Sequence, residues 1–423
     1  MSTPEHAAAH HGDHGHDPVA LEPERFSFPP LAKIACFGAI VAGLIVFAIA
    51  FFIDREVAFM GWTVAAWYGV GLSLFATVFL SYSHLSSAGW HTVLKRVPEA
   101  MMQYLPYGLI TFVIVAAGAT WSNLYEWTHP HDDGSVHAEL IQWKAPWLNL
   151  TSWLVRMVIY FAIWISLSML LVRASRKQDT DGDVKHTGTG RKVGAIYCFL
   201  FAITVTFAGI DWVMSVEPTW FSTMFGVYQF AGIVESGFAA TVLLLIFLRR
   251  SGYLRHAVNE NHLHNLGIWL LAAATFWAYI WFCQFMLIWY SNIPEETQHF
   301  YARWEGPWFY VSFVVNPLLN WVLPFLILLP RPNKRDWNKV ALAAVIALAG
   351  RWVDLWQFMA PRPHHDPLTH TPHATVGVGS VFTIAIMVSI AGLFVYAVLK
   401  ALEKAPLLAK KDPYFEESVH HHL

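Results

Sequence analysis

The chain has 423 residues, of which 56% are hydrophobic and only 13% are charged, and its formal net charge is −2. About a quarter of the residues of soluble domains are charged, so this composition excludes a set of ordinary soluble domains and indicates an integral membrane protein. The near-zero charge and the lack of a long basic run also argue against a nucleic-acid partner, because phosphate binding needs clustered cations.

The chain begins with a His-rich segment that lacks the basic and apolar regions of a cleavable signal, so we expect it to stay attached. Ten apolar runs follow, each long enough to cross a bilayer as a helix. Because the runs are continuous rather than alternating, we predict an all-α integral membrane protein and not a barrel. The predicted spans are 31–53, 62–84, 104–123, 148–172, 192–215, 224–248, 265–290, 307–329, 339–360 and 377–399.

The Lys and Arg residues between these spans are distributed unequally. Of the 27 Lys and Arg residues, Arg156 and Arg351 fall within spans, and those on the side away from the termini are Arg55, Lys144, Arg303 and Arg362. Loops with excess Lys and Arg stay in the cytoplasm, so both termini are predicted to be cytoplasmic.

Two short patterns recur four spans apart. Trp143–Trp147 before span 4 and Trp304–Trp308 before span 8 both read W-x-x-P-W, and Ser122–Thr128 resembles Ser291–Thr297. Trp is common at membrane interfaces, so coincidence is the alternative. We favour an internal duplication, in which spans 2–5 and spans 6–9 form two four-helix bundles related by an axis along the membrane normal, with spans 1 and 10 peripheral.

These predictions divide the chain into six segments. They are a cytoplasmic His-rich tail (1–30), a peripheral first helix with its loop (31–61), a first four-helix bundle (62–215), a second four-helix bundle (216–360), an outer loop with the tenth helix (361–400) and a cytoplasmic tail (401–423).

The sequence offers no ligand set for a redox centre. Cys36, Cys198 and Cys283 lie singly in apolar stretches, and no His falls in mid-membrane, which argues against iron–sulfur clusters, structural zinc and haem b. One outer loop could in principle hold a metal, but its Pro-rich composition favours a solvated loop. Its candidate ligands are His364, His365, Asp366, His370 and His373. We therefore predict no catalytic residue, no metal site and no cofactor bound by this chain.

Five charged residues fall inside the predicted spans, where each costs at least about 2.5 kcal/mol and persists mainly when it is paired or functional. They are Arg156 in span 4, Asp211 in span 5, Glu235 in span 6, and Arg351 and Asp354 in span 9. Glu235 is the deepest, about 15 Å from the start of its span at 1.5 Å per residue. We expect the other four to line a half-channel that leads from the outer face to Glu235.

Structural roles are the alternative for each of these residues. Arg351 and Asp354 share a helix face and can form a local ion pair, Arg156 can pair with Asp211, and Glu235 can be a protonated packing residue. Nearby polar side chains suit either a proton chain or interhelical hydrogen bonds. These are Gln229, Ser236, Gln284, Asn316 and Asn320. A connector with His84, His91, Lys95, Arg96 and Glu99 is typical of an interfacial helix.

Three runs carry a resemblance to a known family. The segments Asp211–Tyr228, Ile288–Thr297 and Pro324–Arg331 resemble the ActF-type membrane subunit of bacterial Alternative Complex III, in the NrfD/polysulfide-reductase membrane family. The resemblance extends from the first span to the tenth. It implies the bacterial inner membrane and a quinol:electron-acceptor oxidoreductase in which partner subunits carry haem c and iron–sulfur clusters.

The resemblance also implies a set of partners and a division of labour among them. The expected partners are an ActC-type NrfD-like subunit, a multihaem cytochrome c, an iron–sulfur subunit, lipids and a terminal oxidase. In such complexes the ActC type is associated with the quinol site, whereas the ActF type is associated with proton conduction and scaffolding. We therefore expect a cofactor-free subunit with proton-pathway candidates at Asp211, Glu235, Arg351, Asp354 and Arg156.

Two other functions stay open. The chain could itself oxidise quinol, which requires a pocket among spans 2–5 with Asp211 or His129 as proton acceptor. It could also be a secondary transporter, which would require interrupted helices in equivalent places of both halves. Pro317 and Pro324 in span 8 have no counterparts in span 4, which disfavours a transporter.

Overall fold

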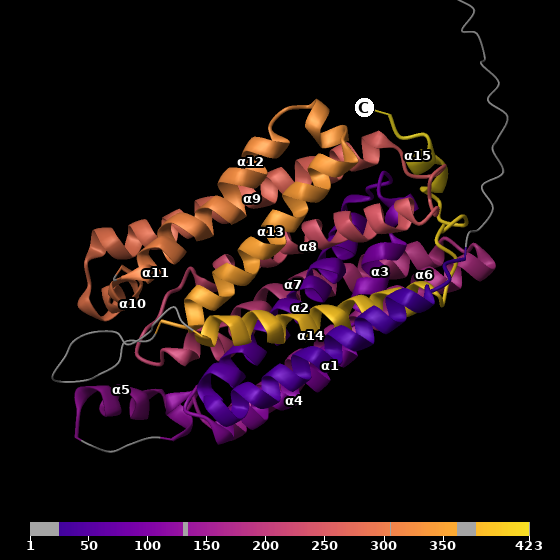
Figure 1. Cartoon of the computed structure of the whole chain (residues 1–423). Helices are drawn as coiled ribbons and strands as arrows, with labels where there is room; N and C mark the ends of the chain where they lie inside the picture. The colour runs from indigo at the N-terminus through magenta and orange to yellow at the C-terminus, as the bar shows by residue number, and fades with distance from the viewer. Residues whose placement is uncertain (1–24, 130–133, 305, 362–377, 423) are drawn as a thin grey trace, which may run out of the picture.

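The computed structural model describes residues 25–129, 134–304, 306–361 and 378–422 (Figure 1). Within these ranges every regular element is helical, and ten helices are long and apolar enough to cross a membrane. The predicted all-α membrane protein with ten spans is therefore confirmed. The start of α1 and the end of α14 lie at one end of the bundle, which we call the terminal face, and the other end is the opposite face.

The first bundle is centred on α2, which is almost entirely buried among the other helices. This helix begins at Arg55, earlier than predicted, because the Asp54 side chain accepts a hydrogen bond from the amide of Val57 (3.1 Å) and caps its first turn. The helices of this bundle are α2 (Arg55–Ser86), α3 (Arg96–Met102), α4 (Leu105–Trp121), α6 (Leu150–Asp181) and α7 (Lys185–Trp212).

The second bundle is centred on α8, and its third span is not a regular α-helix. Two π-helical turns, η4 and η5, interrupt this span on either side of Pro317. The elements of this bundle are α8 (Phe225–Arg250), α9 (Glu260–Ser291), α11 (Pro307–Tyr310), η4 (Val311–Val315), η5 (Leu318–Val322), α12 (Leu323–Leu328) and α13 (Trp337–Met359).

The two bundles pack in the same order. In the first, α2 contacts α4 and α7, and α6 contacts α7; in the second, α8 contacts α9 and α13, and α12 contacts α13. The short helices α5 (Val136–Lys144) and α10 (Pro294–Trp304) stand at equivalent places before the third span of each bundle. This repeated order agrees with the predicted duplication.

The central helices of the two bundles, α2 and α8, contact each other. Their approach depends on Gly237, because a Cβ atom there would lie only 1.9 Å from the Phe75 ring. Phe75 in turn packs edge-on against Phe238, with ring centroids 4.6 Å apart. Close packing through a small residue is a common way to hold membrane helices together.

The remaining two spans, α1 (Pro30–Ile53) and α14 (Val378–Leu402), pack on each other, and α14 also contacts α2 and α3. Most of α1 is exposed outside the helix bundle, as expected for a peripheral span. Along this pair a Cβ atom on Gly43 would lie 2.3 Å from that of Ser389. The two peripheral helices therefore flank the first bundle.

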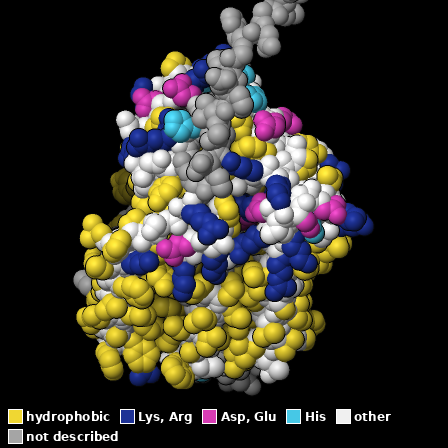
Figure 2. Space-filling model, turned by 90° about the vertical axis from the view of Figure 1, so that its right-hand side faces the viewer, with side chains coloured by type: hydrophobic (Ala, Val, Ile, Leu, Met, Phe, Trp, Pro, Cys, Tyr) yellow, Lys and Arg dark blue, Asp and Glu magenta, His cyan; other side chains and the backbone are white. Residues whose placement is uncertain are grey.

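The terminal face is rich in Lys and Arg, which gather above the apolar sides of the bundle in Figure 2. The C-terminal helix α15 (Phe415–Val419) docks on this face, where the Ser418 hydroxyl donates to the Trp90 carbonyl (2.7 Å) and the Ser418 carbonyl lies 3.0 Å from His262 Nε2. That this face is cytoplasmic stays a prediction from its charge.

Candidate functional site

Asp211 lies at the end of α7 and is fully buried in the first bundle. Arg156 on α6 donates to both carboxylate oxygens, from Nε and from NH2, at 2.8 Å each. Trp147 Nε1 (3.0 Å) and the Tyr160 hydroxyl (2.9 Å) donate to the same carboxylate. Four donors occupy the roughly four lone-pair positions of an ionised carboxylate, so Asp211 is saturated.

Arg156 also makes contacts with residues other than Asp211. Its NH1 donates to the Trp147 carbonyl (3.0 Å) and to the Ser152 hydroxyl (2.5 Å), and its guanidinium stacks 4.1 Å from the centre of the Trp147 ring. A bidentate, stacked arginine of this kind has one preferred geometry. The Arg156–Asp211 pair therefore fits the structural role that was the alternative for it.

Asp354 on α13 is fully buried at a similar place in the second bundle. It accepts hydrogen bonds from the Tyr228 hydroxyl, from Arg351 NH1 (2.6 Å), from Asn316 Nδ2 (3.2 Å) and from Trp277 Nε1 (3.4 Å). The predicted local pair of Arg351 and Asp354 is therefore present. Its donors come from four helical elements, so the carboxylate joins the whole second bundle.

Arg351 divides its hydrogen bonds between Asp354 and the centre of the molecule. Its NH2 donates to Gln229 Oε1 at 2.8 Å, and the same oxygen accepts from Trp67 Nε1 on α2 at 3.0 Å. The guanidinium can approach α8 because residue 232 is glycine, where a Cβ atom would lie 2.2 Å from Arg351 NH1. The arginine thus reaches from α13 to the contact between the two bundles.

Glu235 lies on α8, ten residues after the helix starts at Phe225, and is completely buried. At 1.5 Å per residue this places it about 15 Å along the helix, near the middle of a hydrocarbon core. Neither carboxylate oxygen makes a hydrogen bond within the described residues. Asp354 and Arg351 both interact with it electrostatically. Glu235 is therefore near the Arg351–Asp354 pair but is not tied to it.

The five predicted residues form two groups rather than one row. The structure brings Arg156 to Asp211 in one group, and Arg351, Asp354 and Glu235 together in the other. Within the described residues the two groups are linked through Trp212, Trp67 and Gln229, since the Trp67 ring lies 5.3 Å from the Trp212 ring and bonds to Gln229. The half-channel expected from the outer face to Glu235 stays a prediction, and its five residues lie in two groups.

The π-helical span supplies polar groups to the second site. Asn316 and Asn320 lie about one turn apart, and Asn320 Nδ2 donates to Asn316 Oδ1 at 2.7 Å. Asn320 Oδ1 has no hydrogen-bond partner in the part of the chain that the structure describes, and it would lie 2.7 Å from a Cβ atom on Gly350. π-Helical turns are uncommon and frequently occur at functional sites. Their position beside Asp354 adds to the case for the second site.

A third buried charged group lies towards the opposite face, and the sequence did not identify it. Glu217 accepts from Arg303 NH2 (2.7 Å) and lies 2.8 Å from His299 Nδ1. The His299 ring stacks on Trp220, with centroids 3.9 Å apart. All three charged or titratable residues are buried, although each falls between the predicted spans.

The pKa values of this group follow from its burial. Burial alone would raise the pKa of Glu217, but Arg303 and His299 outweigh it and lower that pKa to about 2. Burial, reinforced by Arg303, lowers the pKa of His299 to about 4, against the opposing effect of Glu217. At neutral pH the group therefore consists of an ionised Glu217, a charged Arg303 and a neutral His299 that donates from Nδ1.

The connector on the terminal face is buried, so the expectation of an interfacial helix there is wrong. All seven residues of α3 are buried, and Arg96 pairs with both Glu99 and Asp179. Lys95 pairs with Asp412 of the C-terminal segment, while burial, with His84 and Lys95 adding to it, lowers the pKa of His91 to about 3. This ion network packs the connector against its neighbours.

Within the described ranges no group of three or more His, Cys, Asp or Glu side chains has the geometry to hold a metal ion. The outer loop with His364, His365, Asp366, His370 and His373 lies outside the described residues. Comparison of the chain with models of protein families and with curated proteins finds no match. The resemblance to Alternative Complex III subunits therefore rests on the sequence segments alone.

Proposed function

We propose that this chain is a cofactor-free membrane subunit of a quinol-oxidising complex of the Alternative Complex III type in a bacterial inner membrane. It scaffolds the subunits that carry haem c and iron–sulfur clusters and contributes a proton pathway through its second bundle. The scaffold role rests on the segments Asp211–Tyr228, Ile288–Thr297 and Pro324–Arg331. The partners are those that the resemblance implies.

The proton pathway rests on one observation, which is the completely buried and unbonded Glu235 beside the Arg351–Asp354 pair. Ionisable groups inside a membrane mark proton and ion routes more often than they serve packing. One guanidinium faces two carboxylates, so a single proton shared between Glu235 and Asp354 makes the group neutral. Moving that proton between them changes no net charge in the membrane interior.

Direct oxidation of quinol by this chain is less well supported. That function was expected to use Asp211 or His129 as proton acceptor, but Arg156 donates to both oxygens of the Asp211 carboxylate. A new proton there would break at least one of the bonds from Arg156. Asp211 is therefore poorly suited to accept and release protons.

Secondary transport is also less well supported. Its alternating mechanism favours interrupted helices at equivalent places of both repeats. The third span of the second bundle is interrupted by π turns, whereas its counterpart α6 is one continuous helix from Leu150 to Asp181. The two halves therefore differ where a transporter of this type would be symmetric.

The proposal is tested on the complex that copurifies with this chain from native membranes. Mass spectrometry is expected to find multihaem cytochrome and iron–sulfur subunits, and a chain that copurifies with neither contradicts the scaffold role. In liposomes, Glu235→Gln is expected to keep quinol oxidation and to lower the number of protons moved per electron. The double variant Arg156→Gln with Asp211→Asn is the matched control and is expected to leave that ratio unchanged.

A further inference from the structure

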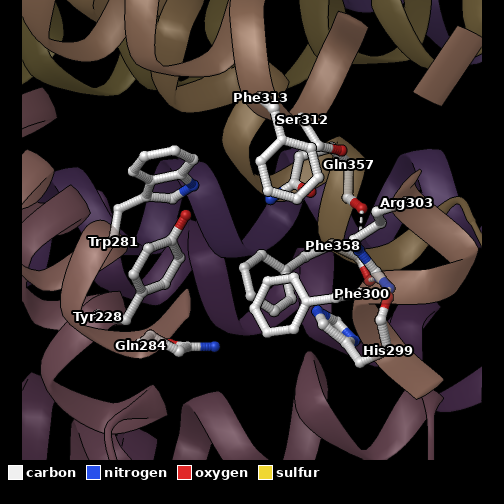
Figure 3. A pocket seen from close by; sticks show the side chains of 10 residues that line it. All are labelled: Tyr228, Trp281, Gln284, His299, Phe300, Arg303, Ser312, Phe313, Gln357 and Phe358. Atoms are coloured by element: carbon white, nitrogen blue, oxygen red, sulfur yellow. Dashed lines mark hydrogen bonds between the residues drawn. The ribbon is translucent and has the colours of Figure 1, made fainter. Parts of the chain in front are cut away.

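A small chamber lies between the Glu217 group and Asp354. Figure 3 shows the rings of Phe300, Phe313 and Phe358 in the middle of the view, with Tyr228 on one side and Arg303 on the other. The enclosed space is about 20 Å³, which is enough for a water molecule. The chamber is lined from α8, α9, α10, η4 and α13, so all the major elements of the second bundle on this side contribute to it.

Two polar atoms on the chamber wall have no hydrogen-bond partner within the described residues. They are Gln284 Oε1 and Ser312 Oγ, and both side chains are more than nine-tenths buried. Buried polar groups are rarely left unbonded, and a site that is both polar and large enough for water usually holds it. The Tyr228 hydroxyl group, His299 and Arg303 on the same wall provide further partners for such a water.

The chamber has a polar inner side and an aromatic outer side. On the inner side, Tyr228 lines the chamber and donates its hydroxyl hydrogen bond to Asp354. On the outer side, Phe300 lines both the chamber and a second, more open cavity of about 480 Å³ between the end of α9 and α10. Phe300 is therefore a thin barrier between the chamber and a groove on the opposite face.

We propose that this chamber is a water-binding site through which protons pass between the opposite face and Asp354, with Phe300 as its barrier. This inference rests on the proposed function of the second bundle. In the transfer step, a chamber water that has taken up a proton from the opposite face gives one proton to the Tyr228 oxygen, while Tyr228 gives its own proton to the Asp354 carboxylate. The water returns to its neutral form. Tyr228 ends unchanged, Asp354 gains one proton, and the reverse exchange releases it.

The Glu217 group has a positioning role in this scheme. Glu217 holds both Arg303 and His299, and Arg303 also donates to the backbone carbonyls of Gln357 (3.0 Å) and Phe358 (2.6 Å) on α13. These bonds fix α10, and with it Phe300, against the second bundle. The charged and titratable side chains that we identify around His299 are Glu217, Arg303 and Tyr228.

Hydration of the chamber can be measured by X-ray hydroxyl-radical footprinting of the intact complex, in which bound water produces radicals that modify adjacent side chains. We expect Tyr228 to be modified although it is only 1% exposed. Tyr125 is the control, because it is equally buried and its hydroxyl donates to the Trp212 carbonyl (2.9 Å) in the first bundle. Equal, background modification of both tyrosines would overturn the proposal.

Conduction is tested with the double variant Gln284→Leu and Ser312→Val, which removes the two unbonded acceptors. We expect the modification of Tyr228 to fall by about tenfold and proton transfer to slow by about tenfold or more. Ser312→Ala alone is the milder variant and is expected to lower both quantities by a smaller factor. Phe300→Ala is expected to raise the modification of Tyr228, because it opens the chamber towards the groove.

The outcomes separate this inference from the function on which it rests. If the chamber variants leave the proton-to-electron ratio intact while Glu235→Gln lowers it, the chamber is not the route and the proposed function stands. If Glu235→Gln also leaves the ratio intact, the proton function fails and conduction through the chamber fails with it.

Discussion

The buried acids of the two bundles, Asp211 and Asp354, have similar partners and different surroundings. Each accepts four hydrogen bonds, and the donors of each include an arginine and a tyrosine. Arg156 gives two bonds to Asp211 from another helix, whereas Arg351 gives one to Asp354 and one to Gln229. We call the first site closed, because Arg156 holds both carboxylate oxygens and braces α6 against α7. We call the second site open, because Arg351 holds one oxygen of Asp354 and also bonds to Gln229, whose Nε2 has no partner within the described residues.

The difference extends to the neighbours of each acid. Within the described residues, several buried polar atoms around Asp354 have no partner, on Gln229, Glu235, Asn320, Gln284 and Ser312, whereas beside Asp211 Trp212 Nε1 is such an atom. A closed site resists a change in protonation because a proton on either oxygen of Asp211 displaces a bond from Arg156, while an open network can rearrange its bonds at lower cost. In our proposal, the two bundles thus provide one structural site and one site suited to protons.

The largest expected effect is on the closed site. Arg156→Leu leaves the Asp211 carboxylate buried without its cation, and removal of one partner from such a pair lowers the free energy of unfolding by about 3–5 kcal/mol. Thermal unfolding in detergent measures this loss. Adding Asp211→Asn to Arg156→Leu is expected to recover much of the stability, because no charge then remains unpaired. A stable single variant would show that the brace is not structural.

The second expected effect is on how the stability of the second bundle depends on pH. The pKa of His299 is lowered to about 4, so the neutral form is favoured in the folded protein, and stability falls as the pH drops from 6.5 towards 4. Glu217, whose pKa is lowered to about 2, adds a further loss between pH 4.5 and 2.

By linkage, acidification through the pKa range of each group is expected to lower the free energy of unfolding by about 3 kcal/mol relative to neutral pH. His299→Gln is expected to flatten the melting-temperature profile between pH 6.5 and 4, and His420→Gln, at an exposed position on the terminal face, is the control. An unaltered profile in His299→Gln would place the acid-sensitive group elsewhere.

Each buried acid has one tyrosine donor, Tyr160 at Asp211 and Tyr228 at Asp354, so the same substitution can be compared at both sites. Tyr160→Phe and Tyr228→Phe each remove one hydroxyl donor from a buried carboxylate, so each is expected to lower the free energy of unfolding by about 1.5–3 kcal/mol. Only Tyr228→Phe is expected to slow proton transfer in the liposome assay. Equal slowing by both variants would remove the distinction between the two sites.

The smallest expected effect tests whether proton transfer in the second bundle depends on its hydrogen bond to the first bundle. Trp67→Phe removes the hydrogen bond to Gln229 that joins the first bundle to Arg351, and is expected to lower stability by about 1 kcal/mol without altering proton transfer. A marked loss of proton transfer in this variant would instead support one continuous path through both sites, as the sequence predicted.

The sequence predicted the fold well because the spans are long apolar runs and because the W-x-x-P-W pattern marks the duplication. It also identified Asp211, Glu235 and Asp354, since charges in apolar runs are conspicuous. It did not predict that Arg351 reaches Gln229, because that contact depends on the absence of a side chain at Gly232 across two helices. Such pairings depend on how the helices rotate against each other.

The buried loops were missed for a related reason. Glu217, His299 and Arg303 lie between the predicted spans, where charged residues are common and do not stand out. Lys95 and Arg96 are in a connector with an interfacial composition. Their burial follows from the folding of α10 over the bundle and of the C-terminal segment over the connector. The one available signal was the number of charged residues within a few positions of Trp and Phe, as in residues 295–309.

The central claim is that protonation changes occur in the second bundle and not in the first. Infrared difference spectroscopy between the oxidised and quinol-reduced complex measures the carboxyl groups that gain or lose a proton. We predict that Glu235→Gln removes or shifts a carboxyl band, and that the double variant Arg156→Gln with Asp211→Asn leaves the spectrum unchanged. A band that survives Glu235→Gln and disappears in the double variant would contradict the account.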